Sequence, residues 1–168
     1  MTAALDTDSA TRIRRARPAD AAALTDLALT SKAVWGYDAS FMAACRAELT
    51  ITPQSILRQP THVLEQDGQA LGFYQLRIEG AAAEVAQFFI APARLRRGLG
   101  RCLWAHLEAT ARAAGATRLE VASDPNAAAF YLAMGMRRVG EAPSGSIPGR
   151  MLPRLVKEIA SGRIRSPA

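Results

Sequence analysis

The sequence is short of the residues on which disulfide-linked, metal-binding and membrane-spanning proteins depend. Its 168 residues include two cysteines, Cys45 and Cys102, and two histidines, His62 and His106. The cysteines lie far apart without C-x-x-C spacing, which predicts reduced thiols in a cytoplasmic protein rather than a disulfide framework or a catalytic pair. The histidines have no acidic partner at a catalytic spacing, and we expect no bound metal. No run of 18 apolar residues occurs, which argues against a membrane span.

The start of the chain is acidic. The first ten residues, MTAALDTDSA, lack a basic stretch followed by an apolar run, so we expect no secretory signal. A chain of this length buries roughly 70% of its unfolded surface in one core. We therefore expect a single domain over residues 11–160, with flexible segments at 1–10 and 161–168.

The net charge of +6 and the isoelectric point near 10.1 raise the question of nucleic-acid binding. The basic residues are overwhelmingly arginine and are spread along the whole chain, together with heavy alanine usage. Such a distribution is typical of coding bias rather than of a phosphate-binding face. We expect neither a nucleic-acid nor a membrane partner. One dense group, between Arg94 and Arg101, needs a local explanation.

Apolar runs separated by turn residues predict a mixed α/β fold in one domain. Asp67-Gly68 is the strongest hairpin signal in the chain. The expected strands cover 11–17, 62–66, 69–78, 83–90, 118–123, 137–141 and 152–159. The expected helices begin at 18–20 and then cover 39–49, 99–114 and 125–134.

The most informative segment joins the strand at 83–90 to the helix that begins at Leu99. Its sequence is PARLRRGLGR, from Pro92 to Arg101. Such a turn directs unpaired backbone N–H groups and the positive end of the helix dipole to one point. Gly98 and Gly100 allow another group to approach the backbone. The segment predicts a pyrophosphate site, and the alternative is a tight turn with solvated arginines.

Two motifs in this half of the chain resemble those of the GNAT superfamily of acetyl-CoA-dependent N-acetyltransferases. The first signature, R/Q-x-x-G-x-G/A, matches LRRGLG at 95–100, except that Leu95 replaces the usual Arg or Gln. The second is an Asn-led helix with a tyrosine and a final glycine, and it matches Tyr131 and Gly135. Its asparagine usually lies seven residues before the tyrosine, where this chain has Asp124, while Asn126 lies five before.

The resemblance implies a mixed, mainly antiparallel sheet flanked by helices, and acetyl-CoA as cosubstrate. In the family the fourth and fifth strands diverge, and the cofactor pairs with exposed backbone between them. Carried over, that backbone belongs to Phe88, Phe89 and Ile90. The other cofactor-binding positions implied are Arg96, Arg97, Gly98, Leu99, Gly100, Arg101 and Asn126.

Tyr131 matches the family's proton donor for the departing thiolate, and its alternative is a packing role. Glu84 and Glu120 are candidates for a general base that removes a proton from the amine, and their alternative is a surface position. A base is dispensable if the amine arrives neutral.

Trp35, Tyr37 and Asp38 form an aromatic and acidic cluster in a loop that walls the acceptor site in the family. An aromatic face and a carboxylate suit a cationic amine, and the alternative is a hydrophobic anchor for the loop. The resemblance implies transfer of an acetyl group to a primary amine of a small molecule or peptide, by direct attack since no cysteine matches the family's motifs as an acyl carrier. The first alternative is a non-catalytic acyl-CoA-binding module, and the less favoured one is a nucleic-acid-binding domain. The oligomeric state is left open, with a homodimer as one option.

Overall fold

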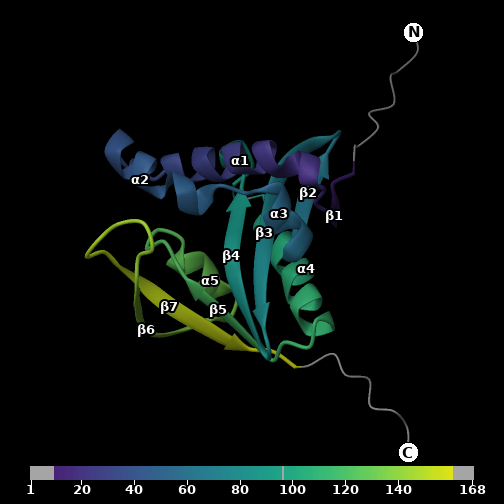
Figure 1. Ribbon diagram of the computed structural model, residues 1–168. Helices are drawn as coiled ribbons and strands as arrows, with labels where there is room; N and C mark the ends of the chain where they lie inside the picture. The colour runs from purple at the N-terminus through teal and green to yellow at the C-terminus, as the bar shows by residue number, and fades with distance from the viewer. Residues whose placement is uncertain (1–9, 96, 161–168) are drawn as a thin grey trace, which may run out of the picture.

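A computed structural model describes residues 10–95 and 97–160 of the chain as a seven-stranded sheet with helices on both faces (Figure 1). The strand order is β1-β2-β3-β4-β5-β7-β6, and β4–β5 is the parallel pair. This confirms the expected mixed, mainly antiparallel sheet. The expected flexible segments fall almost entirely outside the described residues, so they stay a prediction. The strands are β1 (Arg12–Arg15), β2 (Thr61–Gln66), β3 (Gln69–Glu79), β4 (Ala82–Ile90), β5 (Arg118–Ala122), β6 (Arg137–Pro143) and β7 (Met151–Glu158).

The helices follow the expected order with one addition. They are α1 (Ala21–Ala33), α2 (Ala39–Leu49), α3 (Pro53–Arg58), α4 (Leu99–Ala113) and α5 (Ala128–Ala133), with 3₁₀ turns at Pro18–Asp20 and Pro92–Arg94. The sequence analysis missed α3, although Thr52 and Ser55 form a reciprocal cap at its start. It also began α5 too early, because Pro125 lies in a turn three residues before the helix.

Two apolar clusters lie on opposite faces of the sheet. One is formed by α1, α2 and α3 against β2 and β3, with Leu24, Ile56 and Phe73 at its centre. The other lies under α4 and α5 and contains Leu103 and Leu107. Each face is therefore covered by its own helices. Within the described residues, no helix is long and apolar enough to cross a membrane.

A β-bulge at Ala86 changes which face each residue of β4 presents. Val85 pairs with Leu76, but Gln87 pairs with Gln75, so Ala86 is an extra residue. Val85 faces α4, and without the bulge Gln87 would face the same way. Instead Gln87 reaches α2, where its Nε2 donates to the carbonyl oxygen of Glu48 at 2.8 Å.

Strands β4 and β5 pair only at the start of β4. The register joins Ala82, Ala83 and Glu84 to Arg118, Leu119 and Glu120, and it goes no further. Beyond Glu84 the two strands separate, and β5 continues against β7 (Figure 1). The sheet therefore opens into a V between β4 and β5.

Candidate active site

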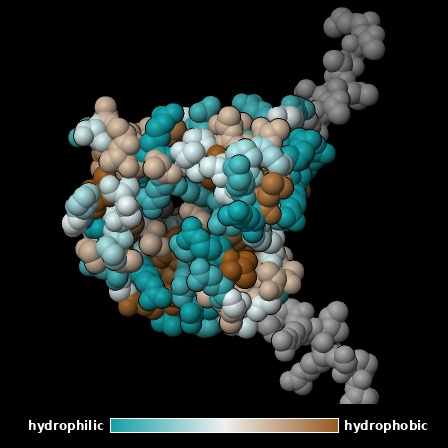
Figure 2. All heavy atoms as spheres, in the orientation of Figure 1, coloured by the Kyte–Doolittle hydropathy of each residue, from teal (hydrophilic) through white to brown (hydrophobic). Residues whose placement is uncertain are grey.

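A cavity of about 550 Å³ occupies the opening between β4 and β5. The space-filling view shows the surface hollowed near the middle of one face (Figure 2). β4 forms one wall from Val85 to Ile90, and the end of β5 with the turn after it forms another. The remaining lining comes from α1, α2, the turn before α4, α5 and the connector between β6 and β7: Ser31, Lys32, Trp35, Cys45, Glu48, Leu49, Arg94, Leu95, Gly98, Gly100, Arg101, Phe130, Tyr131, Ala133, Met134, Ser144, Ser146, Arg150 and Leu152.

The N-terminus of α4 closes one end of the cavity. Gly98 is the N-cap residue, with a φ of +77° and open space where a Cβ would project. Arg94, Leu95 and Arg101 line the same end. This arrangement offers backbone donors, a helix dipole and two guanidinium groups to an anion.

Three other residues expected to bind the pyrophosphate lie differently from Gly98. A Cβ on Gly100 would lie 3.1 Å from Cε2 of Phe130, so this glycine is needed for the packing of α4 against α5. Arg97 and Leu99 do not line the cavity, and the prediction for Arg96 falls outside the described residues.

The antiparallel register selects which backbone groups of β4 face the cavity. Ala91 N donates to Leu71 O at 2.7 Å, and hydrogen-bonded pairs alternate along such a ladder. The backbone of Phe89 is therefore directed at β3, while the backbone groups of Phe88 and Ile90 face the opening. The carbonyl oxygen of Ile90 already accepts from Ser31 Oγ at 3.0 Å. The backbone groups of β4 that remain candidates for pairing with a cofactor are therefore those of Phe88 and the N–H of Ile90.

Tyr131 lies on α5, 5% exposed, in a cluster of aromatic rings that lines the cavity. Its ring centroid lies 6.3 Å from Phe88, 5.7 Å from Trp104 and 5.5 Å from Phe130. Among the described residues, its hydroxyl has no hydrogen-bond partner. Burial, with the negative charge of Asp124, raises the pKa of Tyr131 well above its usual value. The phenol therefore keeps its proton at neutral pH.

A buried ionic cluster fixes the end of α5 behind Tyr131. Glu108 accepts from Trp104 Nε1 at 2.8 Å, and it pairs with Lys157 and with Arg112. Lys157 also donates to the carbonyl oxygen of Met134, the residue after α5, at 2.8 Å. Helix α5 is therefore tied to α4 and β7 at the same point, which holds the tyrosine ring in place.

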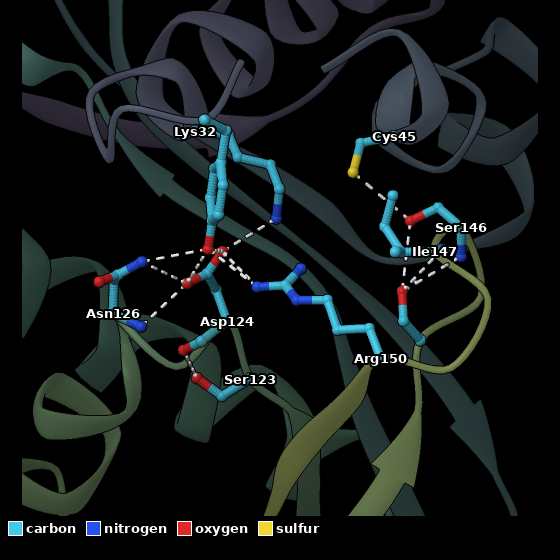
Figure 3. Close-up of polar contacts among 10 residues, drawn as sticks. Lys32, Cys45, Ser123, Asp124, Asn126, Ser146, Ile147 and Arg150 are labelled. Atoms are coloured by element: carbon cyan, nitrogen blue, oxygen red, sulfur yellow. Dashed lines mark hydrogen bonds and ion pairs between the residues drawn. The ribbon is translucent and has the colours of Figure 1, made fainter. Parts of the chain in front are cut away.

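Asp124 is the centre of a polar network that we call the Asp124 hub: Lys32, Tyr37, Asp124, Asn126 and Arg150 (Figure 3). The carboxylate accepts from Tyr37 Oη at 2.8 Å and from Lys32 Nζ at 3.1 Å. It also accepts from the backbone N–H of Asn126 at 2.9 Å. Arg150 lies 3.8 Å from the carboxylate and donates to Tyr37 Oη at 2.8 Å. The hub joins α1, the turn after β5 and the start of β7 across the cavity.

The aromatic side of the hub is a stack of Tyr37 on Phe41 between two cations. The ring centroids lie 4.0 Å apart, and Lys32 Nζ and the guanidinium carbon of Arg150 lie within 6 Å of both rings. Such contacts stabilise partly desolvated cations. The α1–α2 loop is therefore fixed to the cavity wall.

We expect Asp124→Asn to lower the free energy of unfolding by about 2 kcal/mol at pH 7, the range of hydrogen bonds to a charged group. Burial acts to raise the pKa of Asp124, but donation from Asn126 and the charge of Lys32 outweigh it and hold the pKa below its usual value. A depressed folded pKa stabilises above the unfolded value of about 3.9. The difference between wild type and variant should therefore shrink as the pH falls below about 4.

Urea denaturation between pH 3 and 7 measures this difference. Asp38→Asn is the matched control, because asparagine is as good an N-cap as aspartate. A pH-independent gap between wild type and Asp124→Asn would contradict the hub's ionic character.

The three residues expected at the acceptor wall have three different places. Trp35 lines the cavity and is 45% exposed. Tyr37 belongs to the hub and is not a lining residue. Asp38 is the N-cap of α2 and accepts from the backbone N–H of Phe41 at 2.8 Å, so its role is structural. Asn126 lines the cavity, but its amide donates to Tyr37 and Asp124 within the hub.

The two glutamates expected as bases lie outside the cavity. Glu84 pairs with Arg77 at 2.7 Å, and Glu120 pairs with Arg118 and Arg154. Both lie where β4 and β5 are still hydrogen-bonded, before the strands separate. The prediction of a base at these positions therefore finds no support in the geometry.

Sequence reasoning missed several side chains that do line the cavity: Lys32, Cys45, Glu48, Ser144, Ser146 and Arg150. The spacing of Phe41, Cys45 and Glu48 was a usable signal, because these positions share one face of a helix. Within the described part of the chain, no group of three or more His, Cys, Asp or Glu side chains could hold a metal ion.

Comparison with known proteins agrees with this architecture. The 5-NmdU N-acetyltransferase of Pseudomonas phage PaMx11 is 35% identical over 86 residues, which span 50% of this chain and 61% of that relative. The PaiA N-acetyltransferase of Thermoplasma acidophilum, solved in complex with coenzyme A, has a TM-score of 0.73 at 17% identity and covers 89% of this chain and 99% of its own. YncA of Salmonella typhimurium, solved with acetyl-CoA, has a TM-score of 0.62 at 23% identity and covers 95% of this chain and 99% of its own.

The two solved structures share the fold of this chain, and the phage relative shares part of its sequence. Residues 28–136, well over half of the chain, match the model of the acetyltransferase (GNAT) family. The chain belongs to the GNAT acetyltransferase family.

Proposed function

We propose that this protein is an acetyl-CoA-dependent N-acetyltransferase that transfers the acetyl group to a primary amine of a small molecule or peptide. The observation that carries the proposal is the cavity between the separating strands β4 and β5. It has a helix N-terminus with two arginines at one end and a buried, protonated tyrosine in its wall.

The residues present fit coenzyme A. Gly98 leaves open space at the N-terminus of α4, where a pyrophosphate accepts hydrogen bonds from backbone N–H groups. Arg94 and Arg101 add positive charge there, and Arg94 or Arg96 supplies the charge that Leu95 lacks at the first signature position. The N–H groups of Phe88 and Ile90 can pair with an extended amide-containing chain. The complexes of PaiA and YncA with coenzyme A and acetyl-CoA support the same assignment.

Acetyl-CoA supplies an acetyl group activated as a thioester, and Tyr131 holds the proton that the departing thiolate needs. A thiol has a pKa of about 8.5 and a phenol one of about 10, so the phenol gives up its proton only as the bond to sulfur breaks. Burial raises the pKa of Tyr131, which keeps the proton on the phenol but weakens it as an acid, so transfer depends on the hydroxyl being positioned beside the sulfur. The ring is held by Phe88 and Trp104, which keeps its hydroxyl in the cavity wall.

The surroundings of Cys45 favour direct attack by the amine over a cysteine-bound intermediate. Cys45 lines the cavity, and its Sγ lies 3.5 Å from Ser146 Oγ. In the common cysteine–histidine pair, a neighbouring histidine activates the thiol. The two histidines of the chain lie elsewhere, with His106 bonded to Tyr74 and His62 stacked beside it.

We expect coenzyme A at about 100 times its Kd to raise the melting temperature by about 5–10 °C, since such saturation adds about 2.7 kcal/mol of stability. Duplex DNA at physiological salt should leave it unchanged. A screen of primary amines with acetyl-CoA, measuring free thiol, should then show turnover. Stabilisation without thiol release from any amine would favour the non-catalytic module, and stabilisation by DNA alone would favour nucleic-acid binding.

A further inference from the structure

One carboxylate in the cavity wall has no assigned role. Glu48 lies near the end of α2 on the face that also carries Phe41 and Cys45, at spacings of three and four residues. Phe41 stacks on Tyr37 of the hub. Cys45 contacts Ser146 (Figure 3). This face of α2 therefore follows the cavity from the hub to Glu48.

The backbone of Glu48 is held by β4, and its exposed side chain lies beside the connector between β6 and β7. Its carbonyl oxygen accepts from Gln87 Nε2 at 2.8 Å, which ties the end of α2 to β4 beside the bulge. Its carboxylate faces the connector between β6 and β7, since a Cβ on Gly145 would lie 3.6 Å from Oε1. The carboxylate thus lies between α2 and the serine-containing connector, at the cavity.

The carboxylate of Glu48 is unpaired. Within the described residues it forms no salt bridge and no side-chain hydrogen bond, whereas Asp124 accepts from three neighbouring residues. It also lies in the last turn of its helix, where the negative end of the dipole disfavours an anion. Folding therefore gains nothing from a negative charge at this position.

We propose that Glu48 attracts the ammonium form of the acceptor to the cavity and so selects amines that are protonated in solution; the ammonium then releases its proton to water, and the neutral nitrogen attacks the thioester. The proposal rests on the proposed function and adds to it the acceptor's charge. The same cavity is also lined by Leu49, Phe89 and Leu152, which suit an apolar or aromatic body on the amine. Ser146 offers a hydroxyl to the same ammonium group. Glu48 is a specificity-determining residue in this arrangement.

A binding experiment tests the charge preference without requiring turnover. Protein saturated with coenzyme A is titrated calorimetrically with phenethylamine and with its uncharged isostere 2-phenylethanol, and then with butylamine and butanol. Wild type should bind at least one amine about tenfold more tightly than its alcohol, which corresponds to about 1.4 kcal/mol. Glu48→Gln should bring the two affinities within about twofold. Glu141→Gln, on a surface glutamate paired with Arg138, is the control that keeps the preference.

Steady-state kinetics with saturating acetyl-CoA give an independent measure. In Glu48→Gln, KM for the preferred amine should rise about tenfold. The value of kcat should change little, because the substitution leaves Tyr131 and the N-terminus of α4 unchanged. The melting temperature should stay the same or rise, since an unfavourable charge is removed from the helix end. Equal binding of amine and alcohol by wild type, or an unchanged preference in Glu48→Gln, would overturn the assignment. If the wild type does not bind coenzyme A, the proposed function itself is refuted.

Discussion

Replacement of Tyr131 by phenylalanine is expected to lower kcat about 100-fold, within the range for a positioned general acid. The phenol lies in the cavity wall with its pKa raised by burial, so it is protonated wherever the enzyme works. Its oxygen has no hydrogen-bond partner among the described residues, and the aromatic contacts of the ring survive the change. Stability should therefore be unchanged or slightly higher. Stopped-flow measurement of thiol release under single-turnover conditions isolates the chemical step.

Tyr74→Phe is the matched control, with the opposite expected pattern. Tyr74 is fully buried outside the cavity, and its hydroxyl bonds to His106 and Thr110 at 2.9 and 2.8 Å. Removal of that hydroxyl should destabilise the fold by about 1–2 kcal/mol and leave kcat unchanged. A Tyr131→Phe variant that turns over like wild type would return Tyr131 to a packing role.

Local sequence signals predicted those parts of the molecule that depend on neighbouring residues. The bounds of α2 agree with expectation at 39–49, and the Asp67-Gly68 turn joins β2 to β3 as expected. The helix after Gly98 also begins where the glycine-containing turn predicts it. Each of these features is set by periodicity, a cap or a turn within a few residues.

The features that sequence reasoning missed depend on contacts between distant segments. Tyr37 forms a hydrogen bond with Asp124, 87 residues away in the sequence, and another with Arg150, 113 residues away. No pattern in one segment shows such a meeting. The bulge at Ala86 also left no local signal, yet it decides that Gln87 reaches α2 and positions Glu48.

At Asp38 a local signal for structure was overlooked, and its role at the acceptor stays a prediction. Its place beside Trp35 and Tyr37 suggested an acceptor-binding cluster, but its place directly before a helix was the stronger signal. Aspartate is among the preferred N-cap residues, and here it caps α2. The position of Glu84 and Glu120 outside the cavity has a tertiary cause, and their role as bases stays a prediction. Which end of a strand lies at an opening depends on where its pairing stops, and the register of β4 and β5 is a tertiary property.

Gly98→Val is expected to weaken coenzyme A binding about tenfold or more, which corresponds to about 1.4 kcal/mol. Gly98 caps α4 with a φ of +77°, and a side chain there would project into open space at the cavity end. That space is where we place the pyrophosphate, so the valine would block its approach to the backbone N–H groups. Calorimetric titration with coenzyme A measures the loss directly.

The control for Gly98→Val must reproduce its backbone strain without touching the cavity, and the chain offers one. Gly115 follows α4 with a φ of +87°, and a Cβ there also meets nothing within 4 Å. Valine costs about 1–2 kcal/mol in this left-handed region at either position, so both variants should lose similar stability. Only Gly98→Val should lose affinity. Gly100→Val is a poorer test, because its side chain would press on Phe130 and disturb α5. Equal coenzyme A affinity in the two folded variants would contradict the assignment of the pyrophosphate site to the N-terminus of α4.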